Sequence, residues 1–257
     1  MRQFVDPKTS ERVVQHLPSV FWELYLARAL RAHGVSIVRQ VRSKAKQKGP
    51  DLLADSPKVW IEAMVAGGGT GPDALQSPPE LLASDVPNEQ FIMRLTNAFK
   101  CKAKAFKKYI EDGDVATTDA TVIAISGAEL PFSFNERPTP RIVEALLAVG
   151  HHVLSLDKAT GKAIGRHAEF RDSVRKRNGE PVPTDCFLNS EHRHISAVIY
   201  SCADWLNGVT SQGAEFVVVH NPCATVPLPD AWFKAGTEYF FKDSRVRCVK
   251  HGCGLGK

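Results

Sequence analysis

Two acids and one lysine have residue types that could take part in metal-assisted chemistry. Asp51 ends the turn-like sequence Gly49-Pro50-Asp51, and Glu62 interrupts the otherwise apolar segment from Lys58 to Ala66. Carboxylate oxygens are hard ligands suited to Mg²⁺ or Mn²⁺, and such an ion polarises a phosphodiester and helps to generate hydroxide from water. Lys102 would orient that water or stabilise charge in the transition state.

The segment from Lys58 to Ala66 is rich in β-branched and aromatic residues and predicts a strand. The alternation of a strand places Trp60, Glu62 and Met64 on one face. If the chain turns at Ser56-Pro57, residue 51 lies opposite residue 62, although proline is awkward at the third position of a common turn, so the register could slip. Two neighbouring carboxylates repel each other unless one is protonated or a divalent cation lies between them.

Lys102 belongs to a predicted helix from residue 88 to residue 112. One arc of this helix is apolar and consists of Leu95, Ala98, Phe99, Phe106, Tyr109 and Ile110. The opposite side carries Lys100, Lys104, Lys107 and Lys108. Lys102 lies in the middle of the apolar arc, where a lysine either extends to solvent or reaches a buried carboxylate.

The elements around these residues follow the order α-β-β-β-α-β. A first helix is predicted from residue 10 to 33, divided by Pro18 if the proline breaks it, with Glu23 at the border of its apolar stripe. Strands are predicted for residues 35–41, 49–55 and 58–66. A loop rich in glycine and proline leads to the second helix, and a buried strand follows at residues 121–126.

The C-terminal half predicts further α/β structure. We expect a helix at residues 139–149, strands at 153–156, 195–200 and 215–219, an irregular polar segment at 158–189, and an edge strand at 239–249. No shift in composition marks a boundary between domains. The sequence therefore predicts a single α/β domain over residues 1–257, in which residues 127–257 elaborate a core at residues 10–126.

The composition is that of a globular protein, with 257 residues of which 43% are hydrophobic and 24% charged. The net charge of +5 is concentrated in two runs that lack acids, with five basic residues from Arg39 to Lys48 and six from Arg94 to Lys108. Such runs would follow a nucleic-acid backbone with an affinity that falls with salt. The candidates are Arg42, Lys44, Lys46, Lys48, Arg94, Lys100 and Lys104. For the helix lysines, an ordinary solvated surface is the favoured explanation, and contact with nucleic acid comes second.

Several other classes are disfavoured. No apolar run reaches transmembrane length, and the first residues lack the apolar core of a secretory signal. The six cysteines are scattered without a CxxC pair, which predicts reduced thiols and a cytoplasmic protein. Cys248, His251 and Cys253 are close in sequence, but their spacing is not that of a zinc knuckle, so we favour unligated cysteines. His220, in His220-Asn221-Pro222, most simply ends a strand.

The order of elements, together with Pro50-Asp51 and Ile61-Glu62-Ala63-Met64, resembles the PD-(D/E)xK nuclease superfamily, which has a restriction-endonuclease-like fold with a mixed sheet. The resemblance covers about residues 10–126. It implies that Asp51 and Glu62 are catalytic acids that bind Mg²⁺ or Mn²⁺ and that Glu23 assists. The family's lysine usually stands two residues after the second acid, where this chain has Met64. Some branches supply the lysine from the following helix, where Lys102 stands.

Three functions remain open at this stage. The leading hypothesis is a metal-dependent endonuclease acting on DNA, of an uncharacterised bacterial branch and compatible with a homodimer. The alternatives are a nuclease-like fold that has lost catalysis and binds nucleic acid or a protein, and an unrelated α/β enzyme with the same order of elements. Met64 favours the inactive fold, whereas Lys102 argues against it. Each charged residue alone has a structural explanation, but their joint placement favours a metal site.

Overall fold

The computed structural model describes residues 17–38, 49–77, 85–205, 212–230 and 232–251. The predicted nucleic-acid contacts Arg42, Lys44, Lys46 and Lys48 lie outside these ranges, as do Cys253 and the start of the predicted first helix. The helices are α2 (Leu17–Ala32), α3 (Asn88–Glu111) and α4 (Arg141–Leu146). The strands of the first half are β1 (Ile37–Val38), β2 (Leu52–Asp55), β3 (Lys58–Val65) and β4 (Ala120–Ser126). Those of the second half are β5 (Val149–Leu156), β6 (Ala163–Phe170), β7 (Ser173–Arg175), β8 (Pro181–Pro183), β9 (Ala197–Ser201), β10 (Val217–His220), β11 (Thr237–Lys242) and β12 (Arg245–Lys250).

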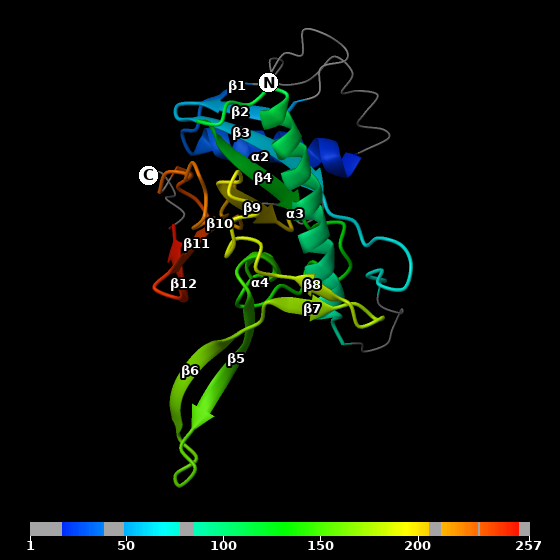
Figure 1. The fold of residues 1–257 in the computed structure, drawn as a ribbon, viewed down its shortest axis with the longest axis vertical. Helices are drawn as coiled ribbons and strands as arrows, with labels where there is room; N and C mark the ends of the chain where they lie inside the picture. Colours follow the sequence, from blue (N-terminus) through cyan, green and yellow to red (C-terminus); the bar gives the residue numbers. More distant parts are fainter. Residues whose placement is uncertain (1–16, 39–48, 78–84, 206–211, 231, 252–257) are drawn as a thin grey trace.

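One eight-stranded sheet organises the fold, with the strand order β1-β2-β3-β4-β9-β10-β11-β12 (Figure 1). The β3–β4, β4–β9 and β10–β11 pairs are parallel, and the other neighbours are antiparallel. The prediction of an α/β fold with a mixed sheet is therefore confirmed. The elements from α2 to β4 follow the predicted order, and β9 to β12 of the C-terminal half continue the same sheet, whereas β5–β6 and β7–β8 form two separate two-stranded sheets.

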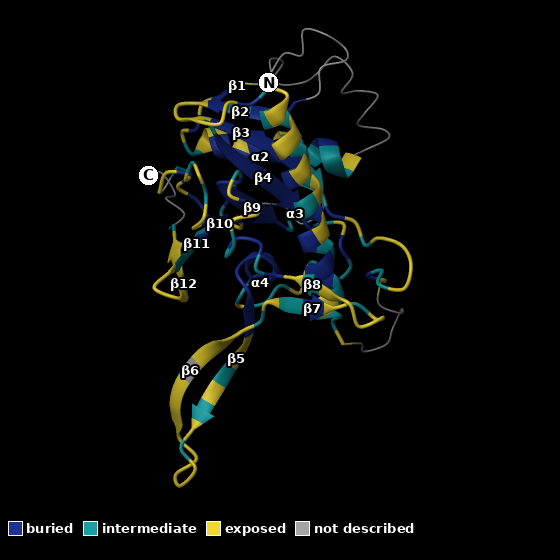
Figure 2. Cartoon of the chain, viewed as in Figure 1, coloured by how far each residue is buried: buried dark blue, intermediate teal, exposed yellow. Residues whose placement is uncertain are grey.

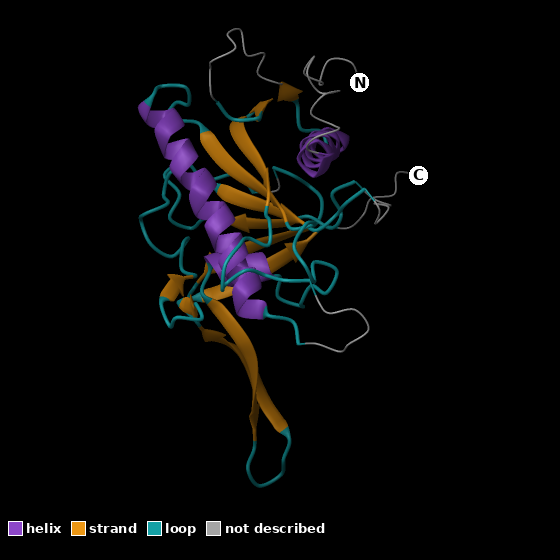
Figure 3. Cartoon of the chain, turned by 90° about the vertical axis from the view of Figure 1, so that its right-hand side faces the viewer, coloured by secondary structure: helices purple, strands orange, loops and turns teal. Residues whose placement is uncertain are grey.

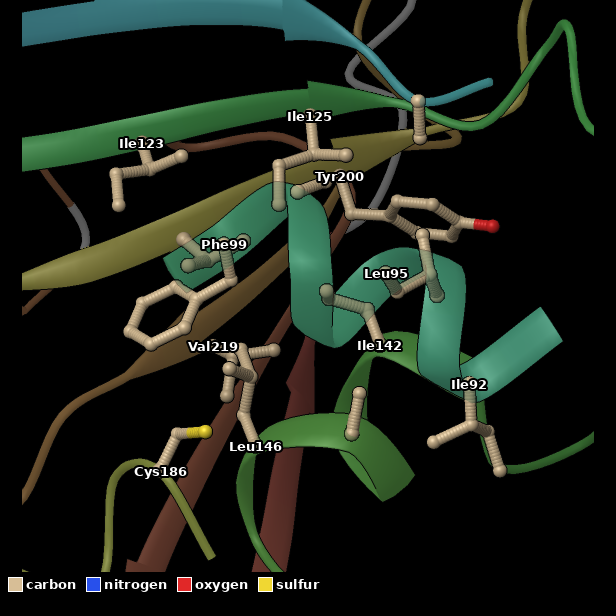
Figure 4. Close-up of a cluster of buried hydrophobic side chains, with 14 of the residues drawn as sticks. Ile92, Leu95, Phe99, Ile123, Ile125, Ile142, Leu146, Cys186, Tyr200 and Val219 are labelled. Atoms are coloured by element: carbon tan, nitrogen blue, oxygen red, sulfur yellow. The ribbon is translucent and has the colours of Figure 1, made fainter. Parts of the chain in front are cut away.

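Helices cover both faces of the sheet, as the alternation of its strands requires. Val59, Ile61 and Ala63 of β3 pack with the apolar side of α2, whereas Trp60 packs in the cluster formed by α3. Figure 3 shows α2 end-on at one side of the sheet and α3 crossing the other side. Figure 4 shows part of the cluster formed by α3, in which Leu95 and Phe99 of the helix pack with strand residues such as Ile123.

Hydrophobic periodicity predicted the long helices and the buried strands correctly. It failed for strands that bury few apolar residues. The segment at residues 158–189 was predicted to be irregular, which is wrong, because it contains β6, β7 and β8. All residues of β6 whose burial is described are exposed, so no alternation of apolar and polar residues marked this strand. Figure 2 shows β5 and β6 as a largely exposed ribbon that extends from the sheet.

The predicted edge strand at residues 239–249 is instead a hairpin of β11 and β12. Asp243 and Ser244 turn the chain with φ values of 53° and 57°. Short polar side chains tolerate this left-handed conformation, which two-residue hairpin turns require. The predicted helix at residues 139–149 is also shorter, because β5 already begins at Val149. None of the helices within the described ranges has the length and apolar character needed to cross a membrane.

Candidate active site

The β2–β3 hairpin has the register that the sequence predicted. Leu52 pairs with Ile61, and Asp55 pairs with Lys58. Continuing this register by one residue places Asp51 opposite Glu62. The intervening turn contains a cis Ser56–Pro57 peptide bond, which accommodates proline at the third position of the turn. The carboxylate of Asp51 is held in place, because its Oδ2 accepts a hydrogen bond of 2.8 Å from the backbone N–H of Ala63.

Glu62 is buried beneath α3, with a side chain only 7% exposed. It shares the α3 side of β3 with Trp60. Lys102 reaches it from α3, and the Nζ atom donates a hydrogen bond of 2.7 Å to Glu62 Oε1. The helix is fixed above the strand by buried residues on both sides of Lys102, including Ala98 and Phe106. Lys102 was expected either to extend to solvent or to reach a buried carboxylate, and the structure shows the contact with a carboxylate.

The Lys102–Glu62 pair keeps the lysine charged at neutral pH. Burial alone would lower the pKa of Lys102, but the negative charge of Glu62, the hydrogen bond between the two side chains and the charge of Asp51 outweigh it and raise the pKa above its usual value of 10.5. Lys102 is therefore a fixed positive charge. It can stabilise an anion or orient a water molecule, but it is not suited to act as a general base near pH 7.

A pocket of about 410 Å³ opens where α2, the β2–β3 hairpin and α3 meet. Its lining consists of Ser19, Trp22, Glu23, Asp51, Ala63, Met64, Val65 and Lys102. The wall formed by α2 is anchored by Trp22, whose indole N–H donates a hydrogen bond to the carbonyl oxygen of Ala124. Glu23, Asp51 and Lys102 therefore line one pocket, whereas the predicted set was Asp51, Glu62 and Lys102. Glu62 is not part of the lining and is linked to the pocket through Lys102.

The donor set suits a hard cation that keeps most of its water. Within the ranges that the structure describes, no group of three or more His, Cys, Asp or Glu side chains is placed to hold a metal ion. A closed protein cage is therefore not present there. Mg²⁺ is commonly bound through only one or two carboxylates, with waters and substrate phosphate completing its shell. Asp51 and Glu23, the two acids that line the pocket, are the residues such an open site would use.

The predicted nucleic-acid contacts on α3 have different surroundings. Arg94 is engaged by the loop after β3, because its Nε donates a hydrogen bond of 3.0 Å to the carbonyl oxygen of Gly67. Its guanidinium also occupies the space beside Gly69, where a Cβ atom would come within 2.3 Å of it. Lys100 is half-buried and Lys104 is exposed, both away from the pocket lining.

Sequence reasoning missed a second buried acid on a strand, Glu238 of β11. His220 and His251 flank it, with Nε2 atoms 3.4 Å from Oε1 and 3.2 Å from Oε2 respectively. Burial acts to raise the pKa of Glu238, but hydrogen bonds and charge from the two histidines outweigh it and lower the pKa. The signal was the one that identified Glu62, an acid inside an apolar strand. Cys248 is exposed and forms no disulfide with the described cysteines.

Sequence reasoning also missed Glu144 of α4, the most buried acid among the residues that the structure describes. Its carboxylate accepts hydrogen bonds from Arg137 at 3.0 Å and from Arg171 at 2.9 Å. Burial raises the pKa of Glu144 despite the lowering effect of the neighbouring arginines. The two arginines come from the segments before α4 and after β6. No local sequence spacing therefore predicts the cluster of Glu144 with these arginines.

No family model, curated protein or solved structure matches this chain. The functional assignment therefore depends on the geometry of the site.

Proposed function

We propose that the protein is a divalent-metal-dependent nuclease that hydrolyses phosphodiester bonds of DNA. The observation that carries this proposal is the 2.7 Å contact between Lys102 and Glu62, next to a pocket lined by Asp51 and Glu23. Two acids on a hairpin, a lysine from the next helix and a third acid from the preceding helix form the set that the PD-(D/E)xK resemblance requires.

Each residue has a separate task in this proposal. A bound Mg²⁺ or Mn²⁺ supplies charge neutralisation at the scissile phosphate and activation of water. Asp51 and Glu62 would hold the ion, which requires Glu62 to turn from Lys102 towards the pocket that Asp51 and Glu23 line. Lys102 remains protonated and stabilises the negative charge that develops on the phosphate oxygens. The apolar wall formed by Trp22, Met64 and Val65 lowers the local dielectric, which strengthens these electrostatic interactions.

The distribution of charge supports a polyanionic substrate. The basic run from Arg39 to Lys48 directly precedes the Gly49-Pro50-Asp51 sequence. Lys100 and Lys104 lie on the same helix as Lys102, on its opposite side. Phosphate contacts of this kind contribute affinity without sequence specificity. Within the described ranges the cysteines are free thiols, which supports a reducing compartment such as the cytoplasm.

One observation favours a second candidate, a nuclease-like fold that binds nucleic acid or a protein without cleaving it. Met64 stands where the family usually has its lysine, and Glu62 is engaged by Lys102 instead of lining the pocket. If that ion pair is permanent, Glu62 is not available to a metal ion. The two candidates differ in one measurable property, cleavage that depends on a divalent cation.

Cleavage of plasmid and single-stranded DNA in Mg²⁺, Mn²⁺ or EDTA separates the candidates. We expect cleavage in either metal and none in EDTA, with losses of about 10²–10³-fold in Asp51→Asn, Glu62→Gln and Lys102→Met. Matched controls are Asp55→Asn on the same hairpin and Lys107→Met on the same helix, both exposed and expected to retain wild-type rates. Cleavage that survives Glu62→Gln would contradict the proposal. Binding without cleavage in every metal would select the inactive module.

A further inference from the structure

The pocket lies along a part of β3 that β2 does not reach. β2 pairs with β3 only as far as Ile61. Within the described ranges no strand pairs with the same side of β3 beyond that residue, whereas β4 continues on its other side up to Val65. Ala63, Met64 and Val65 line the pocket. The backbone of these three residues, here called the open edge of β3, is therefore accessible from the pocket.

The N–H of Val65 points to this open edge. Successive N–H groups of a strand point alternately to its two sides within the sheet. The N–H of Ala66 donates a hydrogen bond of 2.8 Å to the carbonyl oxygen of Ser126 at the end of β4, so it faces β4. The N–H of Ala63 faces the other way, because it donates to Asp51 Oδ2. Val65 is two residues after Ala63 and shares its direction.

The pocket therefore combines a backbone donor with an ammonium group. Lys102 remains positively charged at neutral pH. Its Nζ atom carries three N–H donors, and Glu62 Oε1 accepts a hydrogen bond from one of them. Donors of these two kinds form strong hydrogen bonds with anionic oxygens, such as those of a phosphate group. The ligand that suits Val65 and Lys102 together is an anion.

The acids of the pocket restrict which anion can bind. Asp51 and Glu23 line the same pocket, so a free anion is repelled unless a divalent cation offsets their charge. The donors at Ala63 and Val65 are about 7 Å apart along the strand. The first holds the Asp51 carboxylate, and the second is left for the ligand. A phosphate that binds together with a divalent cation satisfies both halves of the pocket.

A peptide strand is a poorer ligand for this edge. Strand addition depends on a row of alternating backbone donors and acceptors. At the open edge the N–H of Ala63 is already used by Asp51, which leaves Val65 as the remaining donor among the described residues there. The pocket also measures only about 410 Å³, which is the size of a site for a small ligand.

We propose that the N–H of Val65 and the ammonium group of Lys102 form a phosphate-binding subsite on the open edge of β3. The assignment of this phosphate to the DNA backbone rests on the proposed nuclease function, in which Val65 positions the phosphodiester without reading sequence. The subsite itself requires only a phosphate group, so inorganic phosphate is the other source of the same chemistry. Phosphate and Mg²⁺ should each strengthen the binding of the other.

The amide signal of Val65 tests the subsite without any measurement of cleavage. The protein is labelled with ¹⁵N-valine, and the Val65 signal is identified by its loss in Val65→Ile. Titration with dimethyl phosphate in the presence of Mg²⁺ should shift the amide proton of Val65 downfield, because the N–H then donates to an anionic oxygen. The signal of Val59, which pairs with Ala54 of β2, is the internal control and should not move.

Inorganic phosphate is the second arm of the same titration. A response to inorganic phosphate but not to dimethyl phosphate would retain the subsite and assign free phosphate as its ligand. A Val65 signal that ignores both compounds in Mg²⁺ would overturn the proposal. A response of equal strength without Mg²⁺ would overturn the proposed coupling to the cation.

Removal of the backbone donor is the matched mutational test. Val65→Pro removes the N–H, and proline is tolerated at an edge where the N–H faces away from the ladder. Val65→Ile also changes the side chain but keeps the N–H. The affinity for dimethyl phosphate in Mg²⁺, measured from its ³¹P signal, should be at least about tenfold lower in Val65→Pro than in Val65→Ile. Lys102→Met should lower it as well, whereas Lys107→Met, at an exposed position of α3, should not.

The outcomes separate the subsite from the nuclease. Circular dichroism verifies that Val65→Pro is folded, and if it is not, the amide shift of the wild type decides. A Val65 response to phosphate in a protein that cleaves no DNA would retain the subsite and reject the nuclease. Cleavage of DNA at equal rates in Val65→Pro and Val65→Ile, with a wild-type Val65 signal that ignores phosphate, would retain the nuclease and overturn the subsite.

Discussion

Two buried acids of this protein, Glu62 and Glu144, are both paired with basic side chains but lie in different settings. Glu144 is 1% exposed and lies between Arg137 and Arg171, which contact both of its oxygens. Glu62 is 7% exposed and has the single ammonium group of Lys102 on one oxygen. Asp51 lies next to the Glu62 pair, and a pocket of about 410 Å³ opens beside it.

The difference separates a structural clasp from a candidate functional site. Arg137 and Arg171 each donate from one guanidinium nitrogen to the Glu144 carboxylate, and they connect α4 to the segment before it and to the end of β6. At Glu62 a second carboxylate, Asp51, lies next to the pair, and the pocket opens beside it. A buried ion pair therefore points to function when a like charge and a pocket accompany it, and burial alone does not suffice.

The comparison predicts its largest stability effect at the clasp. Glu144→Ala should lower the free energy of unfolding by about 3 kcal/mol, because it leaves Arg137 and Arg171 without their buried counter-charge. Urea denaturation at pH 7 measures the change. Glu129→Ala, at an exposed glutamate, is the control and should change stability by less than about 0.5 kcal/mol. Equal stabilities of the two variants would remove the structural role assigned to Glu144.

A smaller effect is expected at the pocket. Lys102→Met should cost about 1–2 kcal/mol, because Glu62 loses its partner but Lys102 is itself partly exposed. The double variant Glu62→Gln with Lys102→Met should be more stable than the sum of the single changes by about 1 kcal/mol, since the two groups interact directly. Purely additive effects in the same urea experiments would show that the 2.7 Å contact contributes nothing to folding.

The smallest predicted effects are changes of stability with pH, and those of Lys102 and Glu144 occur in separate pH ranges. The raised pKa of Lys102 means that its contribution is present below pH 10.5 and is lost as the pH rises through the higher folded value. The raised pKa of Glu144 means that the folded state binds its proton more tightly, so stability declines as the pH rises just above 4.5. Stability curves of the wild type, Lys102→Met and Glu144→Gln should locate these two ranges. If the stability contribution of Lys102 were lost already below pH 10.5, the assigned ion pair would be contradicted.

The sequence predicted the pocket better than it predicted the clasp, for a physical reason. The register of the β2–β3 hairpin follows from one turn position, and the helical repeat of α3 turns Lys102 towards the protein interior. The packing of α3 on β3 then brings Lys102 to Glu62, and it leaves Glu62 outside the pocket lining. Glu144 depends on arginines that only the tertiary fold brings close. The strand β6 escaped detection because an exposed ribbon needs no apolar alternation. Hydrophobic periodicity in a sequence reflects the burial of apolar residues. It gives no signal for an exposed strand or for polar contacts between residues distant in sequence.

Binding of Mn²⁺, followed by the electron paramagnetic resonance signal of the free ion, tests the central claim most directly. We expect one ion per chain, with an affinity that falls at least about tenfold in Asp51→Asn and in Glu62→Gln but is unchanged in Asp55→Asn. Absence of Mn²⁺ binding up to about 10 mM, or binding that is indifferent to Asp51→Asn, would contradict a metal site at this pocket.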